Sequence, residues 1–278
     1  MHVRLIIVPY DSGHRALRMG AGPLKLGAAA DRLRARGIEV SAAPIEAPPG
    51  FTREIGTTFA LHRSVAAEVR GAIAAEAFPI VLSGNCGSAV GALAGAGAGT
   101  GIAWFDGHGD FNTPEISVSG YLDGMALAVA TGRCFATLAR SVPGFTPVAD
   151  RDAFLIGSRD LDPLEREALG NSAVGWVTVR SIRDRGAAAA LEPALRRMRA
   201  PRIHLHVDLD VHDPALAPAN EFAPPDGLTP AEVQDAVRAI RAARPICSAS
   251  FASYDPAVDP GGSCLEAGLR LIELVATI

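Results

Sequence analysis

GIAWFDGHGDFN, at residues 101–112, and IHLHVDLDVHDP, at residues 203–214, are two short apolar runs that each end in closely spaced acidic residues. A continuously apolar run of this length is typical of a strand buried on both faces of a parallel sheet. In an open parallel sheet, ligands bind beyond the carboxyl ends of the strands. The acids of both stretches are therefore expected at the edge of the sheet that carries a binding site.

Similar runs alternate with longer helical patterns along the whole chain, which favours a parallel sheet covered by helices on both faces. Strands are expected at 3–8, 80–82, 101–105, 153–156, 175–179, 203–207 and 247–254, with a weaker one at 38–42. Helices are expected at 27–36, 57–77, 123–131, 187–199, 230–243 and 265–277. Pro230 suits a first helical position, with Thr229 as N-cap. Residues 43–52 and 215–227 are expected to form long loops.

Length and composition favour one cytoplasmic enzyme domain that spans residues 1–278. Hydrophobic residues make up 49% of the chain, enough for a single buried core, and no repeat or linker divides it. The net charge of −4 and the scattered basic residues give no footprint for nucleic acid or an anionic membrane. Residues 1–10 lack the features of a signal peptide, and the four cysteines contain no CxxC pair, which indicates reduced thiols. Monomer, trimer and hexamer all remain compatible with the sequence.

The two acidic clusters predict a metal site. If the chain stays extended, alternation puts Asp106, His108 and Asp110 on one side, and Asp208 shares a face with Asp210. Four carboxylates at neighbouring strand ends repel one another unless a cation neutralises them, so a pair of divalent ions is the natural occupant. Oxygen ligands with one imidazole suit Mn²⁺. The alternative is that these acids cap helices and bind solvent.

The same residues carry a family resemblance. DGHGDFNTP at residues 106–114 resembles the ureohydrolase signature DAHxDxNTP, and DLDVHDP at residues 208–214 resembles the second signature, DVDxxDP. The resemblance to this arginase-like superfamily covers nearly the whole chain. It implies a three-layer α-β-α sandwich around a mainly parallel sheet of about eight strands. It also implies two Mn²⁺ ions with a bridging hydroxide that attacks a guanidino carbon. The implied ligands are Asp106 and Asp208 as bridges, Asp110 on one ion, and His108 and Asp210 on the other.

Cys86 is the first departure from the family pattern, because it stands where the GGDH motif has a metal-binding histidine. Thiolate is a soft ligand and a poor partner for Mn²⁺. We therefore expect the metal position next to Cys86 to be weak, partly empty or selective for another ion. Without the resemblance, Cys86 would be interpreted as a buried structural thiol. His206 alternates with Asp208 along its strand, so its side chain is expected beside the ligands in a supporting role.

Asp123 and Ser253 depart from the family at the catalytic and distal-recognition positions. Asp123 replaces a histidine thought to shuttle protons, and an aspartate of ordinary pKa is a poor donor near pH 7. Either its pKa is perturbed or the leaving group needs less help; as an alternative, Asp123 caps the helix that follows it. Ser253 replaces the glutamate that grips the guanidinium, so the distal recognition group is neutral. Asp110 and Asp123 are the predicted catalytic residues.

The amino-acid end of the family's site is retained. RDLDPLE at residues 159–165 resembles arginase's RDVDPxE, so Asp162 and Glu165 are expected to read an α-ammonium group. Asn112 and Ser119 match positions that bind the α-carboxylate, and Tyr121 completes the predicted substrate-binding set. The alternative for Asp162 and Glu165 is that they only cap the helix after Pro163.

These features together predict an arginine-like amino-acid substrate with a weakly basic distal group. Nω-hydroxy-L-arginine fits, because N-hydroxylation lowers the basicity of guanidine, and its hydrolysis gives L-ornithine and hydroxyurea. The departures resemble those of the hydroxyarginine amidinohydrolases of D-cycloserine biosynthesis. Two alternatives stay open. One is an arginase or another guanidino or formimino hydrolase, and the other is a non-catalytic paralogue.

Overall fold

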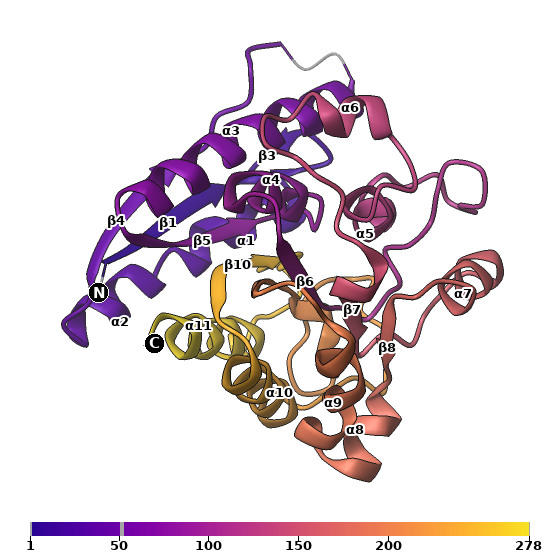
Figure 1. Ribbon diagram of the computed structural model, residues 1–278. Coiled ribbons are helices and arrows are strands. Elements are labelled where there is room, and N and C mark those ends of the chain that lie inside the picture. The colour runs from indigo at the N-terminus through magenta and orange to yellow at the C-terminus, as the bar shows by residue number, and fades with distance from the viewer. Residues whose placement is uncertain (1, 51–52, 278) are drawn as a thin grey trace.

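The computed structural model describes residues 2–50 and 53–277, and its centre is an eight-stranded sheet in the order β4-β1-β5-β10-β9-β6-β7-β8 (Figure 1). Every neighbouring pair of strands in it runs parallel. The strands are β1 (His2–Val8), β4 (Glu39–Pro44), β5 (Ala77–Ser83), β6 (Thr100–Phe105), β7 (Ala153–Ile156), β8 (Gly175–Val177), β9 (Arg202–Asp208) and β10 (Ile246–Ala252). The predicted α/β class is confirmed.

Helices cover both faces of this sheet (Figure 1). One face packs against α3 (Glu54–Ala74), α4 (Ser88–Ala96), α5 (Ala126–Ala130) and α6 (Ala136–Arg140). The other packs against α1 (Gly22–Leu26), α2 (Ala29–Ala35), α8 (Val179–Arg185), α9 (Ala187–Arg197), α10 (Pro230–Ala243) and α11 (Ser263–Ala276). The helix α7 (Pro163–Gly170) lies at the β8 end, and a small hairpin joins β2 (Tyr10–Asp11) to β3 (His14–Arg15). In the described part of the chain, no helix combines the length and apolar character needed to cross a membrane.

Two elements have the predicted bounds because strong local signals delimit them. The strand β7 is the short apolar run Ala153–Ile156, and α10 begins at Pro230 and ends at Ala243. The hydroxyl of Thr229 accepts the amide of Glu232 at 3.2 Å, and the Glu232 carboxylate accepts the amide of Thr229 at 2.8 Å. This reciprocal pair is a capping box, which satisfies two amides that the first turn leaves unpaired.

Several predicted bounds were wrong. The expected helix at 27–36 is split into α1 and α2, and the one at 57–77 begins and ends three residues earlier as α3. The strand expected at 175–179 stops at Val177 because Thr178 caps α8, and the strand expected to reach residue 254 stops at Ala252. The helix at 123–131 is a 3-10 turn, η2 (Asp123–Met125), followed by α5. Residues 215–227 form no helix or strand, as predicted. In the other expected loop, at 43–52, residues 51–52 lie outside the described part of the chain.

The sequence analysis missed α4, in which six of the nine residues are alanine or glycine. Glycines weaken a helical prediction, yet here they allow α4 to pack closely on α3. A Cβ atom on Gly91 would lie 2.6 Å from the carbonyl oxygen of His62, and one on Gly95 would lie 2.6 Å from the Cβ of Val69. Both distances are shorter than van der Waals contact. The absence of side chains at these positions therefore sets the spacing between the two helices.

Candidate active site

Four adjacent central strands, β5, β10, β9 and β6, deliver the predicted functional residues to one edge of the sheet. Cys86 follows β5, Ser253 follows β10, and Asp208 ends β9. After β9 the chain turns into a 3-10 helix, η4 (Leu209–Val211), which carries Asp210. After β6 come Asp106, His108 and Asp110. The parallel topology thus brings together segments that are far apart in the sequence, at the sheet edge where ligands are expected.

A cavity of about 410 Å³ opens at this edge, a volume suited to a small molecule. Twelve of the thirteen predicted site residues line it, and the remaining one, Asp106, is buried beneath with 1% of its surface exposed. The lining also includes residues that the sequence analysis did not name: Arg18, Met19, Ser117, Gly124, Asp160, Asn220 and Phe222. No motif marks these residues, because their place in the wall depends on how distant loops pack.

Asp106, His108 and Asp210 form one group whose ligand atoms all lie within 4.8 Å of one another. The Nδ1 atom of His108 is 3.1 Å from Asp210 Oδ2 and 3.5 Å from Asp106 Oδ1. Burial by itself would lower the pKa of His108, but the negative charges of Asp210 and Asp106 outweigh burial and raise it. Burial would likewise raise the pKa of Asp210, and the imidazolium instead holds it below its usual range. Without a metal, a protonated His108 takes the place of a cation here.

Asp210 also differs from the extended geometry predicted for it. Its amide donates to Asp208 Oδ1 at 2.8 Å, and its Oδ1 accepts the amide of Gly107 at 2.8 Å. This turn, and not strand alternation, brings Asp208 and Asp210 together. Asp110 likewise leaves the extended region, with φ 49°, a left-handed conformation that is uncommon for residues other than glycine. Such outliers persist where the surroundings enforce them, and often at functional sites.

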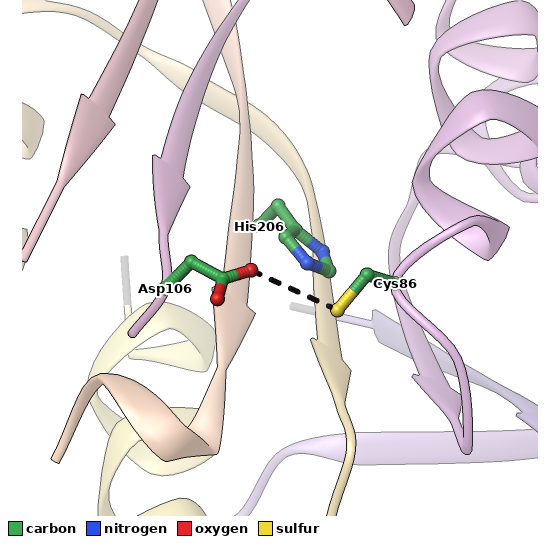
Figure 2. Close-up of side chains that lie close together, drawn as sticks. All are labelled: Cys86, Asp106 and His206. Carbon is green, nitrogen blue, oxygen red and sulfur yellow. Dashed lines mark hydrogen bonds between the residues drawn. The ribbon is translucent and has the colours of Figure 1, made fainter. Parts of the chain in front are cut away.

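Cys86, Asp106 and His206 form a second group within the same distance limit (Figure 2). The Cys86 thiol donates to Asp208 Oδ2 at 2.8 Å and lies 4.0 Å from Asp106 Oδ2. Burial, followed by the charge of Asp208, raises the pKa of this thiol well above its ordinary value. His206 is fully buried, and its Nε2 has no hydrogen-bond partner among the described residues. Both donors are therefore available to an ion.

Asp106, Asp110 and Asp208 are buried acids that lack enough nearby positive charge to compensate them. Burial is the largest cause that raises the pKa values of Asp106, Asp110 and Asp208, and neighbouring acids add to it. The Oδ2 atom of Asp110 is buried without a hydrogen-bond partner among the described residues. A buried, unpaired carboxylate costs several kcal/mol unless a cation or proton compensates it. The donor set and its orphaned oxygen fit a pair of divalent ions.

Asp123 does not cap the helix that follows it, contrary to the alternative considered above. Its carboxylate accepts the amides of Cys86 at 2.9 Å and Gly87 at 2.8 Å, and the side-chain amide of Asn85 at 2.9 Å. It therefore holds the segment that leads from β5 into α4. Burial raises the pKa of Asp123 to about 7, although these hydrogen bonds oppose the shift.

Ser253 lies at the floor of the cavity, with 4% of its surface exposed. Its φ of 61° explains why β10 ends at Ala252, and Asn220 donates to its carbonyl oxygen at 2.8 Å. The hydroxyl of Ser253 is 3.4 Å from the Sγ of Cys86. Two neutral groups thus sit side by side at the end of the cavity nearest the acids.

At the opposite wall, Asp162 and Glu165 have partners within the protein. Glu165 accepts the amides of Phe111 at 2.8 Å and Asp162 at 3.1 Å, and Asp162 accepts the side-chain amide of Asn112 at 3.1 Å. Asp162 and Glu165 form a capping box on α7, as the alternative predicted, yet both also line the cavity. Burial raises the pKa of Glu165 to about 7 despite its two amide partners.

A family model described as "Arginase family" matches residues 1–277. The chain belongs to the arginase family. Arginase from Bacillus subtilis is 31% identical over 226 residues, which cover 80% of this chain and 76% of that protein. Arginase from Bacillus caldovelox is 29% identical over 275 residues, which cover 92% of each chain. The crystal structure of arginase from Bacillus cereus superimposes with a TM-score of 0.89 at 27% identity, covering 99% and 98% of the two chains.

Membership of the arginase family makes this chain a metal-dependent amidinohydrolase. The family uses a binuclear metal centre, and the two donor groups that share Asp106 are where this chain can hold one. The acids and His108 lie in the two stretches whose resemblance to the family signatures implies metal ligands. The predicted departures from the family pattern, Cys86, Asp123 and Ser253, lie close together at one end of the cavity. Asp123 accepts the amide of Cys86, and the hydroxyl of Ser253 lies beside the Sγ of Cys86.

Proposed function

We propose that the protein hydrolyses the guanidino group of an arginine-like amino acid with Mn²⁺, and that its substrate is Nω-hydroxy-L-arginine. Water adds to the guanidino carbon and the bond from that carbon to Nδ breaks, so the products are L-ornithine and hydroxyurea. One observation carries the choice of substrate. The end of the cavity nearest the metal-binding acids presents the neutral hydroxyl of Ser253, together with an aspartate whose pKa is about 7. This end suits a weakly basic group better than a full cation.

Ser253 supports a hydroxyguanidine at the distal position. A permanently charged guanidinium is best recognised by a carboxylate, because charge-assisted pairs are about twice as strong as neutral hydrogen bonds. A hydroxyguanidine is far less basic, and a hydroxyl can donate to it or accept from it. Its own N–OH group also carries an exchangeable proton. Substrate binding at this end would then need no anionic partner.

Asp123 supports the protonation of the leaving amine. A general acid works best when its pKa is near the working pH, and burial raises the pKa of Asp123 to about 7. Its carboxyl lines the cavity beside the backbone of Cys86. The metal pair, once bound to the acids and His108, would supply an activated water as nucleophile. Asp123 would hold the proton that Nδ needs when it leaves.

The opposite wall supports an α-amino acid. Asn112 and Ser119 line it as candidate partners of the α-carboxylate, and Tyr121 lies between the two ends. Arg18 brings a guanidinium to the rim, where its Nε is 2.8 Å from the buried Asp11. This cation favours a substrate with a carboxylate. Asp162, which is partly exposed to the cavity, provides the negative charge for the α-ammonium group.

Arginine is the second candidate, and the relatives named above favour it because they carry the name arginase. The test is to load the purified protein with Mn²⁺ and to measure ornithine release from L-arginine and Nω-hydroxy-L-arginine in parallel. A kcat/KM at least about 10-fold higher for the hydroxylated substrate supports the proposal, and equal or faster release from arginine contradicts it. Release from neither, with both metals bound, would favour another guanidino or formimino substrate or a non-catalytic paralogue.

A Ser253→Glu variant tests the distal assignment on the same protein. It restores the acidic group that the family uses at this position, and it should shift the preference towards arginine. Ser119→Ala is a matched control at the other end of the cavity, because it should weaken both substrates alike and leave their ratio unchanged. A preference that Ser253→Glu leaves unchanged would contradict recognition by this residue.

A further inference from the structure

We propose that His206 is a metal ligand and that, with Cys86 and Asp106, it forms a sulfur–oxygen–nitrogen position that prefers Zn²⁺ or Co²⁺ to Mn²⁺. The inference rests on the metal-binding part of the function proposed above and is independent of the substrate. It assigns a role to a histidine that neither of the two metal signatures contains. It also predicts that the two metal positions of this chain differ in their preferred ion.

The three side chains converge from three different strands. Cys86 follows β5, Asp106 follows β6, and His206 lies on β9 between them in the sheet (Figure 2). One ligand atom from each lies within 4.8 Å of the others. Zinc binds at about 2.3 Å from sulfur and about 2.0–2.1 Å from nitrogen or carboxylate oxygen, so modest side-chain shifts bring all three into reach of one ion.

His206 has the features expected of a metal ligand. Its ring is fully buried and stacks on Trp104, with 4.0 Å between ring centroids, so it cannot turn towards solvent. Its Nδ1 is 2.7 Å from the hydroxyl of Ser250, whereas Nε2 has no partner among the described residues. A buried polar atom without a partner costs about 1–3 kcal/mol. An ion in front of Nε2 would remove this cost.

Ser250 supplies the outer contact that metal-bound histidines usually have. It also lies 2.8 Å from Nε2 of His204, and Nδ1 of His204 lies 2.8 Å from Ser248. If Nδ1–H of His206 donates to Ser250, the serine hydroxyl donates to His204, and His204 donates to Ser248. This direction leaves Nε2 of His206 with a free lone pair. The chain of contacts thus permits the tautomer that a metal ligand requires.

The donor set determines which ions the position prefers. Cys86 belongs to a buried apolar cluster, yet its sulfur faces two acids and the hydroxyl of Ser253. Thiolate and imidazole together favour Zn²⁺ and Co²⁺, whereas Mn²⁺ prefers oxygen. The neighbouring group of Asp106, His108 and Asp210 has no sulfur. His206 would therefore restore, from β9, an imidazole at the position where Cys86 has replaced one.

Metal binding and spectroscopy test this assignment without any measurement of turnover. Wild-type protein should bind two Co²⁺ per chain and show a sulfur-to-cobalt charge-transfer band in the near ultraviolet. Cys86→Ser should abolish the band. His206→Asn should weaken one of the two ions at least about 100-fold and leave the other in place, because outer contacts alone already change affinity about 10- to 100-fold. The ion that remains shows that the variant has folded.

His62→Asn is the matched control, because His62 is also buried and also has a ring nitrogen, Nδ1, without a partner among the described residues, but lies outside the donor group. It should keep both ions within about 3-fold of wild-type affinity. The double variant Cys86→His/His206→Asn should regain the second ion, since it supplies an imidazole from the other side of the position. An unchanged second ion in His206→Asn, or equal losses in His206→Asn and His62→Asn, would overturn the assignment.

X-ray absorption of the wild-type, zinc-loaded protein identifies the ligands without depending on the folding of any variant. One sulfur at about 2.3 Å per pair of ions, with two imidazoles per pair, supports Cys86 and His206 as ligands. A single imidazole per pair, attributable to His108, contradicts the proposal. A protein that passes these tests but turns over neither arginine nor its hydroxylated form would refute the proposed substrate alone.

Discussion

Both ends of the cavity contain buried acids, yet their hydrogen bonding differs. Glu165 accepts two backbone amides and caps a helix, so the fold already compensates its buried oxygens. Asp110 has a buried oxygen with no partner in the described part of the chain, and Asp106 and Asp208 are crowded by like charge. The difference shows that a buried acid indicates a ligand only when the protein itself leaves it uncompensated.

Asp208→Asn should have opposite effects on activity and on the stability of the metal-free protein. We expect kcat/KM to fall at least about 10³-fold, because the variant removes a carboxylate that we propose to bridge the two ions. Without metal, the same change removes a charge that its neighbours repel, so the melting temperature in chelator should rise. Metal content, turnover and thermal unfolding with and without chelator measure both effects. A lower melting temperature in chelator would contradict the repulsion.

Asp123→Asn should lower kcat by about 10²–10⁴-fold, the usual contribution of a general acid. Because the acid must be protonated, wild-type activity should fall as the pH rises through the pKa of Asp123. Burial raises that pKa to about 7, whereas bound cations would lower it. The variant should lack this basic limb in its pH profile of kcat. Loss of activity with an unchanged pH profile would indicate that Asp123 only holds the segment after β5.

Glu165→Gln should destabilise the fold by about 1–3 kcal/mol while both metals remain bound. The amide group of glutamine would turn a donor towards one of the two amides that Glu165 now accepts, and this leaves a buried donor unpaired. Denaturant unfolding and metal analysis measure the two quantities. Loss of metal from this variant would break the contrast between the two ends of the cavity.

The metal-free protein should lose stability as the pH rises from about 4 to about 7. The folded-state pKa values of Glu165 and Asp123 are about 7, above their ordinary values of 4.5 and 3.8. Groups with a raised folded pKa contribute stability below the unfolded pKa and lose it as the pH passes the folded one. Thermal unfolding in chelator across this range measures the slope. The slope should be shallower in Glu165→Gln, and an increase in stability with pH would contradict both assignments.

Ser119→Ala should have the smallest effect, a rise in KM of about 5-fold with kcat nearly unchanged. A single neutral hydrogen bond to the α-carboxylate is worth about 1 kcal/mol. Its loss should affect the ground state and the transition state alike, since the α-carboxylate takes no part in the bond cleavage. Steady-state kinetics on the hydroxylated substrate test this expectation. A large fall in kcat would place Ser119 closer to the chemistry than proposed.

The sequence predicted what local patterns and strand topology determine. Continuous apolar runs define β6 and β9, and the acids that follow them must meet because both strands end at the same edge of a parallel sheet. The sequence could not predict features that depend on packing. Neither the left-handed backbone of Asp110 and Ser253 nor the contacts of Asp123 with the segment after β5 leave a periodic signal. Arg18 lines the cavity from the 3-10 helix η1 (Arg18–Ala21), and no motif in the sequence places it there.

His206 illustrates the boundary between these two classes. Alternation along β9 placed it on the side of Asp208, as predicted. The sequence could not predict that its Nε2 has no partner, or that Trp104 and Cys86 lie beside it. These features depend on how the neighbouring strands are aligned. A pattern along one strand indicates the direction of a side chain, whereas its role depends on the strands beside it.

Because α4 packs closely on α3, residues between these two helices can affect the depth of the active site. The segment with Cys86 and Gly87 leads directly into α4, and Gly91 and Gly95 fix how near that helix lies to its neighbour. A side chain at either glycine would require α4, with the Cys86 thiol in the segment before it, to shift relative to α3. Substrate size and metal preference could thus be retuned through residues that never touch either one.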